Sequence, residues 1–163
     1  MEHGNTRDLL AAYNVIYKEA DEVYRRLAQH YGLSYCALWI LYYIRECNGS
    51  LTQREVCEML SRSKQTVNSA LKGLERAGYI RLGAADSSGR GKRIALTEAG
   101  EALARTTVDA VMGMEQCALA SLTEGEQAEF LRLYRKYVFQ LQKEGEKVLQ
   151  ASSSRADCGG GAG

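Results

Sequence analysis

The sequence predicts a mainly α-helical fold with one small β-hairpin. Apolar residues recur every three or four positions over most of the chain, which is the period of an α-helix. A single Gly- and Ser-rich segment, residues 83–91, separates two short runs of β-leaning residues. No Pro occurs among the 163 residues, so helix ends must depend on Gly and on capping side chains. The length suits one domain, or one core with extended arms.

The first two helices are expected before residue 49. Over residues 6–31, one apolar line steps by three and four from Leu9 to Leu27, and a second repeats every seven residues. So wide an apolar stripe indicates that the helix packs against more than one neighbour, and a second subunit is one candidate. Ser34 is the expected N-cap of a second helix, YCALWILYYIRECN, which is apolar on nearly all sides and therefore belongs in a core.

Two short helices joined by a turn are expected next, and they make a helix-turn-helix unit. Thr52 and Glu55 form a capping box, which is a specific signal for a helix start. Ser63 is the expected cap of the following helix, which ends at Gly78. Its buried stripe is expected to consist of Val67, Leu71 and Leu74.

A β-hairpin with a long tip is expected after Gly78, with YIRL and KRIAL as its strands. A long helix then runs from Thr97 to about Leu119, and a second capping box, Thr123 with Glu126, starts the last helix. The tail ASSSRADCGGGAG is low in complexity and is predicted to be disordered. The apolar stripe of the last helix is expected to consist of Phe130, Leu133, Tyr134, Tyr137, Val138 and Leu141.

The composition excludes several classes of protein. Hydrophobic residues make up 45% and charged residues 25%, as in ordinary globular domains. There is no run of about 18 apolar residues and no signal-peptide pattern, so we expect a cytoplasmic protein without a membrane partner. The five cysteines lie at wide spacings, which favours neither a disulfide framework nor a metal site. His3 and His30 are the only histidines and no catalytic motif stands out, so neither an enzyme nor a cofactor is expected.

Positive charge is concentrated in the middle of the chain, although the net charge is only +1. Residues 61–93 hold eight Lys or Arg against two acidic residues, whereas residues 94–151 hold six against nine. A basic block inside a nearly neutral protein indicates a polyanionic partner for that block.

The helix after Ser63 carries side chains on its exposed face that hydrogen-bond to base edges or hold phosphates. The second helix of a helix-turn-helix enters the major groove, and cations on a neighbouring hairpin can reach phosphates or the minor groove. The sequence therefore predicts binding to double-stranded DNA. The expected contacts are Thr52, Gln53, Ser63, Lys64, Gln65, Thr66, Asn68, Ser69, Lys72, Arg90, Lys92 and Arg93.

This order of elements resembles the MarR family of winged-helix transcriptional regulators. LTQREVCEMLSRSKQTVNSALKGLERAGYIRL resembles the DNA-reading core of the family, and GRGKRIALTEAG resembles its wing. The resemblance implies a homodimer on a near-palindromic operator, with Arg90 as the wing-tip arginine. It also implies the following division: N-terminal core and dimerisation helices (6–48), a winged helix-turn-helix (49–96), C-terminal dimerisation helices (97–150) and the disordered tail (151–163).

The resemblance further implies a repressor whose DNA affinity is changed by a small aromatic ligand. The candidate pocket residues are Tyr13, Tyr17, Tyr35, Trp39, Tyr42 and Tyr43, because aromatic rings with polar tips suit a flat ligand. One alternative is a thiol-based redox sensor, since Cys36 lies in a first helical turn where the dipole would lower its pKa if it is exposed. The other alternative is a winged helix that serves protein contacts.

Overall fold

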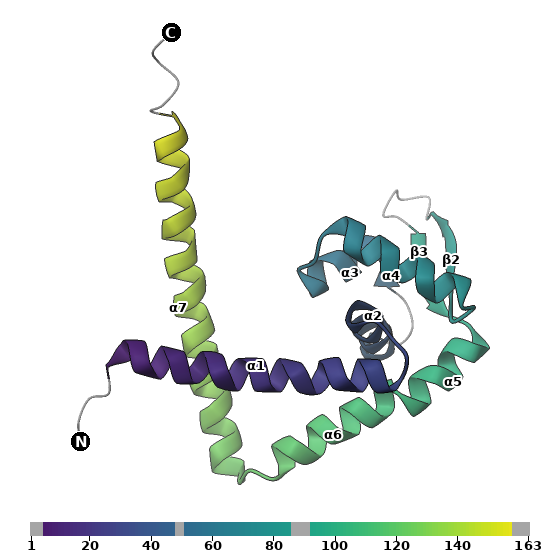
Figure 1. The fold of residues 1–163 in the computed structure, drawn as a ribbon, viewed down its shortest axis with the longest axis horizontal. Helices are drawn as coiled ribbons and strands as arrows, with labels where there is room; N and C mark the ends of the chain where they lie inside the picture. The colour runs from purple at the N-terminus through teal and green to yellow at the C-terminus, as the bar shows by residue number, and fades with distance from the viewer. Residues whose placement is uncertain (1–4, 48–50, 86–91, 158–163) are drawn as a thin grey trace. The chain divides into compact units, whose positions relative to one another are not determined.

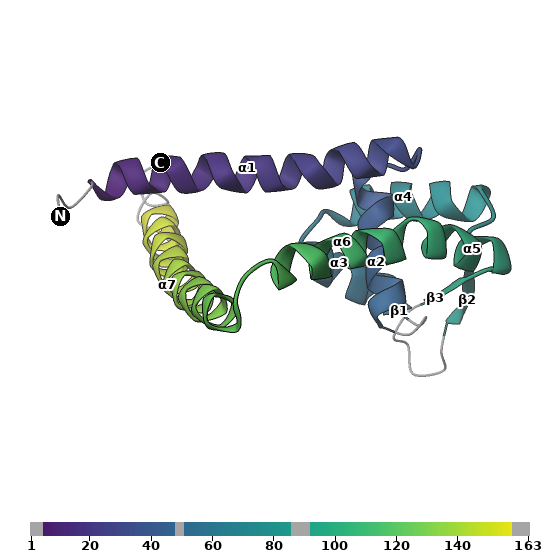
Figure 2. The ribbon, with the colours of Figure 1, turned by 90° about the horizontal axis from the view of Figure 1, so that it is seen from below.

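The computed structural model describes residues 5–47, 51–85 and 92–157. The described chain divides into two compact units, one ending at Met114 and the other beginning at Glu115. Figures 1 and 2 show the elements of both units. The elements are α1 (Thr6–His30), α2 (Tyr35–Glu46), β1 (Leu51–Thr52), α3 (Gln53–Leu60), α4 (Lys64–Arg76), β2 (Ile80–Ala85), β3 (Lys92–Leu96), α5 (Glu98–Thr106), α6 (Val108–Ala120) and α7 (Glu124–Asp157).

Helix α2 is the centre of the first unit, and it contacts α1, α3, α4 and α5 (Figure 1). The predicted cap is present, since the Ser34 side chain accepts a hydrogen bond from the backbone N–H of Ala37 at 3.1 Å. Ile40, Leu41 and Ile44 are completely buried in this helix. They join the apolar faces of α3 and α4 in one core, which confirms that α2 is a core helix.

The sheet has three antiparallel strands in the order β1-β3-β2. The hairpin of β2 and β3 was expected, and Ile80 pairs with Leu96 at its base. Strand β1 was not expected, because two residues are too few to show the alternation of a strand. Leu51 of β1 pairs with Ile94 of β3, so the sheet ties the start of α3 to the hairpin.

Gly78 and Gly100 fix the connections on either side of the hairpin. Gly78 follows α4 with a φ of +76°, a conformation that residues with a side chain rarely adopt. A Cβ atom on Gly100 would lie 1.9 Å from the backbone oxygen of Tyr79, so only Gly allows α5 to approach this closely. The Thr97 hydroxyl donates a 2.6 Å hydrogen bond to the backbone oxygen of Gly78 and closes the base of the hairpin.

The prediction of one helix from Thr97 to about Leu119 is wrong. The chain breaks at Thr107, whose φ and ψ are −112° and −67°, and continues as α6. The buried Thr107 hydroxyl donates a 2.8 Å hydrogen bond to the Leu103 carbonyl oxygen, so its polar group is satisfied inside the core.

The second unit contains the end of α6 and the long helix α7. The predicted capping box is present, because Thr123 Oγ1 donates to Glu126 Oε2 at 2.8 Å and accepts from the Glu126 N–H at 3.3 Å. Helix α7 continues to Asp157, so residues 151–157 are helical and not disordered as predicted. The last six residues, 158–163, lie outside the described residues.

Candidate nucleic-acid interface

Helices α3 and α4 are joined by a three-residue turn, and both predicted caps are present. At the start of α3, Thr52 Oγ1 accepts the Glu55 N–H at 3.2 Å, and the Glu55 carboxylate accepts the Thr52 N–H at 2.7 Å. Ser61 adopts a left-handed conformation with a φ of 47° and ends α3. The Ser63 side chain then accepts the Thr66 N–H at 3.2 Å and starts α4. The prediction of a helix-turn-helix is confirmed.

Helix α4 has a buried apolar face and an exposed polar face. Val67, Leu71 and Leu74 are buried as predicted, and they fix the rotation of the helix about its axis. The exposed positions bear donors and cations suited to phosphates and base edges. They are Lys64, Gln65, Thr66, Ser69 and Lys72.

Thr52 and Ser63, both predicted to contact DNA, act as helix caps. Thr52 is 7% exposed, and its hydroxyl belongs to the capping box of α3. The Ser63 side chain caps α4 and lies 2.8 Å from the Thr66 hydroxyl. Both residues position a helix start; Thr52 is buried, whereas Ser63 is exposed beside the polar face of α4.

Gln53 and Asn68 are both half-buried and contact each other. The Gln53 side-chain N–H donates a hydrogen bond to the side-chain oxygen of Asn68, which links the first residue of α3 to the middle of α4. The sequence did not predict this pair, because a separation of fifteen residues carries no periodic signal.

The hairpin is described at its base only. Arg90, the predicted wing-tip residue, lies outside the described residues. Lys92 begins β3, and the Arg93 side chain on the same strand is exposed. Arg93 pairs through its backbone with Thr52, so the strand that carries it lies directly beside the start of α3.

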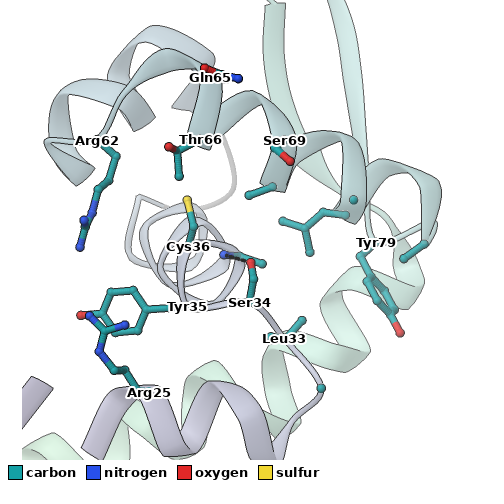
Figure 3. Close-up of a pocket in the computed structure, with 16 residues that line it drawn as sticks. Arg25, Leu33, Ser34, Tyr35, Cys36, Arg62, Gln65, Thr66, Ser69 and Tyr79 are labelled. Carbon is teal, nitrogen blue, oxygen red and sulfur yellow. Dashed lines mark hydrogen bonds between the residues drawn. The ribbon is translucent and has the colours of Figure 1, made fainter. Parts of the chain in front are cut away.

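An open cleft of about 880 Å³ lies between α4 and the segment that joins α1 to α2. Figure 3 shows Arg62 and Thr66 on one side of it and Arg25 and Tyr35 on the other. Arg62 lies in the turn before α4 and, among the described residues, makes no hydrogen bond or ion pair. Arg62 belongs to the basic block of the sequence, but helical period does not mark it as a candidate contact, because a turn residue belongs to no helix face.

The side chains at one wall of the cleft form a polar cluster. The Tyr35 hydroxyl donates to Asp21 at 2.5 Å, and Arg25 donates to the same carboxylate at 2.8 Å. The Arg25 guanidinium also lies 4.6 Å from the centre of the Tyr35 ring. The hydrogen bond from Tyr35 lowers the pKa of Asp21, and burial raises the pKa of Tyr35. Tyr35 is therefore held in place as a neutral phenol.

The predicted ligand residues are distributed over two places. The Trp39 ring lies 5.1 Å from Tyr42 and 6.0 Å from Tyr43, and Tyr35 packs against its edge. These four residues form one aromatic cluster on α2, of which Tyr35 alone lines the cleft. Tyr13 and Tyr17 stack on each other on α1, with ring centres 6.3 Å apart.

The Cys36 thiol is half-buried, and burial raises its pKa. This is opposite to the lowering expected for an exposed thiol at a helix start, because the loss of water disfavours the thiolate. Among the described residues no group of three His, Cys, Asp or Glu could hold a metal ion. Within the same described residues, no helix combines the length and apolar character needed to cross a membrane.

Comparison with known proteins gives consistent matches. A family model described as the MarR family matches residues 31–91. A curated protein of Mycobacterium tuberculosis, named as an HTH-type transcriptional repressor, is 36% identical over 86 residues. The matched segment covers 53% of this chain and 62% of that relative.

Two solved structures cover more of the chain. A MarR family regulator from Neisseria meningitidis is 25% identical with a TM-score of 0.69, and the match covers 91% of this chain and 99% of that one. MepR, a transcription regulator of the Staphylococcus aureus multidrug efflux pump MepA, is 25% identical with a TM-score of 0.57. That match covers 80% of this chain and 96% of MepR.

Proposed function

We propose a DNA-binding regulatory function for this chain, which belongs to the MarR family. The resemblance and the fold class predicted from the sequence are confirmed by the family match and the solved structures. The matching proteins are transcriptional regulators by name, in agreement with the expectation that the chain is not an enzyme. We propose that it binds double-stranded DNA as a homodimer and represses transcription.

The observation that carries this proposal is the exposed face of α4. Its rotation is fixed by a buried stripe and its start by the Ser63 cap, so the polar face is held in one orientation. Lys64 and Lys72 supply cations on this face, and Gln65 and Ser69 supply hydrogen-bonding groups. A capped, rigid helix of this composition fits a major groove, where phosphate contacts fix its position and base contacts select a sequence.

The apolar stripe of α7 supports the homodimer. Phe130 is 52% exposed, Leu133 49% and Tyr134 45%, although all three lie on one face of the helix. On α1, Leu9 and Ile16 are each 64% exposed. Apolar area of this extent on two helices is covered when a second copy packs against it. A two-fold dimer would place two α4 helices on a near-palindromic site.

The cleft beside α4 supports control by a small aromatic acid. The exposed Arg62 guanidinium is suited to a carboxylate, and the Tyr35 ring offers an apolar wall for a flat ligand. Since Thr66 and Ser69 of α4 also line the cleft, an occupant touches the helix that we assign to DNA. The raised pKa of Cys36 makes a thiol switch the weaker alternative.

Selection of bound duplexes from a random library tests the proposed function. Purified protein at moderate salt is expected to enrich a near-palindromic motif whose half-sites lie about one helical turn apart. Affinity for that motif should fall steeply as salt is raised, because phosphate contacts release counterions. Absence of both enrichment and salt-dependent duplex binding would favour a winged helix used for protein contacts.

A further inference from the structure

We propose that Gln53 and Asn68 act together as one reading unit for the major-groove edge of an adenine. The inference rests on the proposed function, because it requires α4 to lie in a major groove. Its basis is the hydrogen bond from the Gln53 amide to the Asn68 side-chain oxygen, which joins side chains from two different helices.

Both residues are held in position by the fold. Gln53 is the first residue of α3 and follows Thr52, whose capping box with Glu55 contains three hydrogen bonds, two of them from backbone N–H groups. Asn68 follows Val67, which is completely buried, so the rotation of α4 fixes where the Asn68 side chain leaves the helix. Two anchored side chains that share a hydrogen bond lose less freedom on binding than two independent ones.

The shared hydrogen bond determines which groups are left for a base. It uses one of the two N–H donors of Gln53 Nε2 and one of the two lone pairs of Asn68 Oδ1. Among the described residues, no other hydrogen bond engages either side chain, so the Asn68 Nδ2 group and the Gln53 Oε1 oxygen are the two groups that the bond leaves wholly unengaged. An adenine presents one acceptor, N7, and one donor, the N6 amino group, in the major groove. The pair therefore offers the complementary set, with the donor on one residue and the acceptor on the other.

The neighbouring cations support this assignment. Lys64 and Lys72 lie four residues before and after Asn68, so all three belong to one row along α4. Both lysines are exposed, whereas Asn68 is half-buried and contacts Gln53 of α3. Ammonium groups at both ends of the row would hold the phosphate backbone and set the register, and the amide pair between them would contact a base.

The test combines library selection with a double-variant cycle. Wild-type protein is expected to enrich adenine at one position of each half-site. Gln53→Ala and Asn68→Ala should each remove this preference at the same position and lower the affinity for the selected duplex about 10-fold. The double variant should bind about as weakly as either single variant, because each change breaks the same unit. Lys64→Ala combined with Gln53→Ala is the control, and those two effects should multiply.

Modified bases test the contact at atomic level. At the preferred position, 7-deazaadenine removes N7, and purine without the 6-amino group removes the donor. Each is expected to weaken binding by wild-type protein and to leave binding by Asn68→Ala unchanged. Thermal unfolding of every variant checks that the fold is intact.

The outcomes separate this inference from the proposed function. Effects of Gln53→Ala and Asn68→Ala that multiply, preferences that disappear at two different positions, or enrichment of a base other than adenine would each overturn the shared reading unit while DNA binding stands. A wild-type protein that enriches no sequence and binds no duplex would overturn both.

Discussion

Helices α4 and α7 carry the same kind of apolar stripe, yet one stripe is buried and the other is not. In α4, Val67, Leu71 and Leu74 are at most 3% exposed, whereas Phe130 and Leu133 of α7 are about half exposed. Both stripes follow the period of an α-helix, so the sequence pattern predicts burial without saying against what. The core of the first unit covers α4. We infer that a second copy of the chain covers α7.

The largest expected effect comes from placing a charged side chain in the apolar stripe of α7. Leu133→Glu is expected to convert the dimer to a monomer and to lower DNA affinity at least about 100-fold, because a buried unpaired carboxylate is costly and two half-sites no longer bind together. Light scattering and a duplex-binding titration measure the two effects. Lys143→Glu, at an exposed position on the side of the helix opposite the stripe, is the control and should leave the dimer intact. A dimeric Leu133→Glu protein would show that this stripe is not the interface.

Truncation of the α4 stripe should act on folding instead of assembly. Leu71→Ala removes a side chain that is 2% exposed and is expected to lower the free energy of unfolding by roughly 2–5 kcal/mol. Chemical denaturation measures the change. Leu133→Ala is the matched variant on α7, and it should change the dimer dissociation constant far more than the unfolding of the first unit. If Leu71→Ala and Leu133→Ala lowered the free energy of unfolding of the first unit equally, the α7 stripe would serve folding as the α4 stripe does.

The contact between α5 and the hairpin gives a smaller effect. Gly100→Ala places a Cβ atom against the Tyr79 backbone oxygen and should cost roughly 1–3 kcal/mol of stability, since backbone must move. Gly73→Ala is the control within α4, where a Cβ atom meets nothing within 4 Å, and it should stabilise the helix by up to about 1 kcal/mol. Thermal melts compare the two. A neutral Gly100→Ala would mean that α5 does not pack this closely.

The smallest expected effect concerns the ion pairs that join α2 to α5 and α6. Arg45 donates to both oxygens of Asp109, at 2.9 and 2.8 Å, and to Glu101 at 3.0 Å. The hydrogen bond from Arg45 lowers the pKa of Asp109 below its ordinary value of 3.8. The stability that ionised Asp109 gains from Arg45 is therefore fully present above pH 3.8, and it is lost as pH falls through the lower pKa of Asp109 in the folded protein. Arg45→Met should flatten the loss of melting temperature below about pH 4, and an unchanged acid profile would contradict this.

The elements with local signals were predictable, and those that depend on distant partners were not. Ser34, Ser63 and the two capping boxes mark helix starts through contacts three residues apart, so the sequence displays them directly. Strand β1 forms because the distant strand β3 pairs with it, and a two-residue segment has no sequence pattern that predicts such a pairing. The break at Thr107 was missed because its hydroxyl bonds to the preceding turn without any Gly or Pro to mark it.

The candidate site shows the same division. The polar face of α4 follows from helical period and was predicted. The burial of Thr52, the contact between Gln53 and Asn68 and the position of Arg62 at the cleft each require a second segment of the chain. The aromatic residues were recognised as a group, yet only their positions in space separate Tyr35 at the cleft from the packed Trp39 cluster.

The salt dependence of duplex binding tests the role of α4 most directly. The dissociation constant for the selected duplex would be measured over a range of salt for wild-type protein and for Lys64→Ala with Lys72→Ala. The variant is expected to bind more weakly and to show a shallower slope of log affinity against log salt, by about one for each phosphate that it no longer neutralises. An unchanged affinity and an unchanged slope would show that this face of α4 does not lie on DNA.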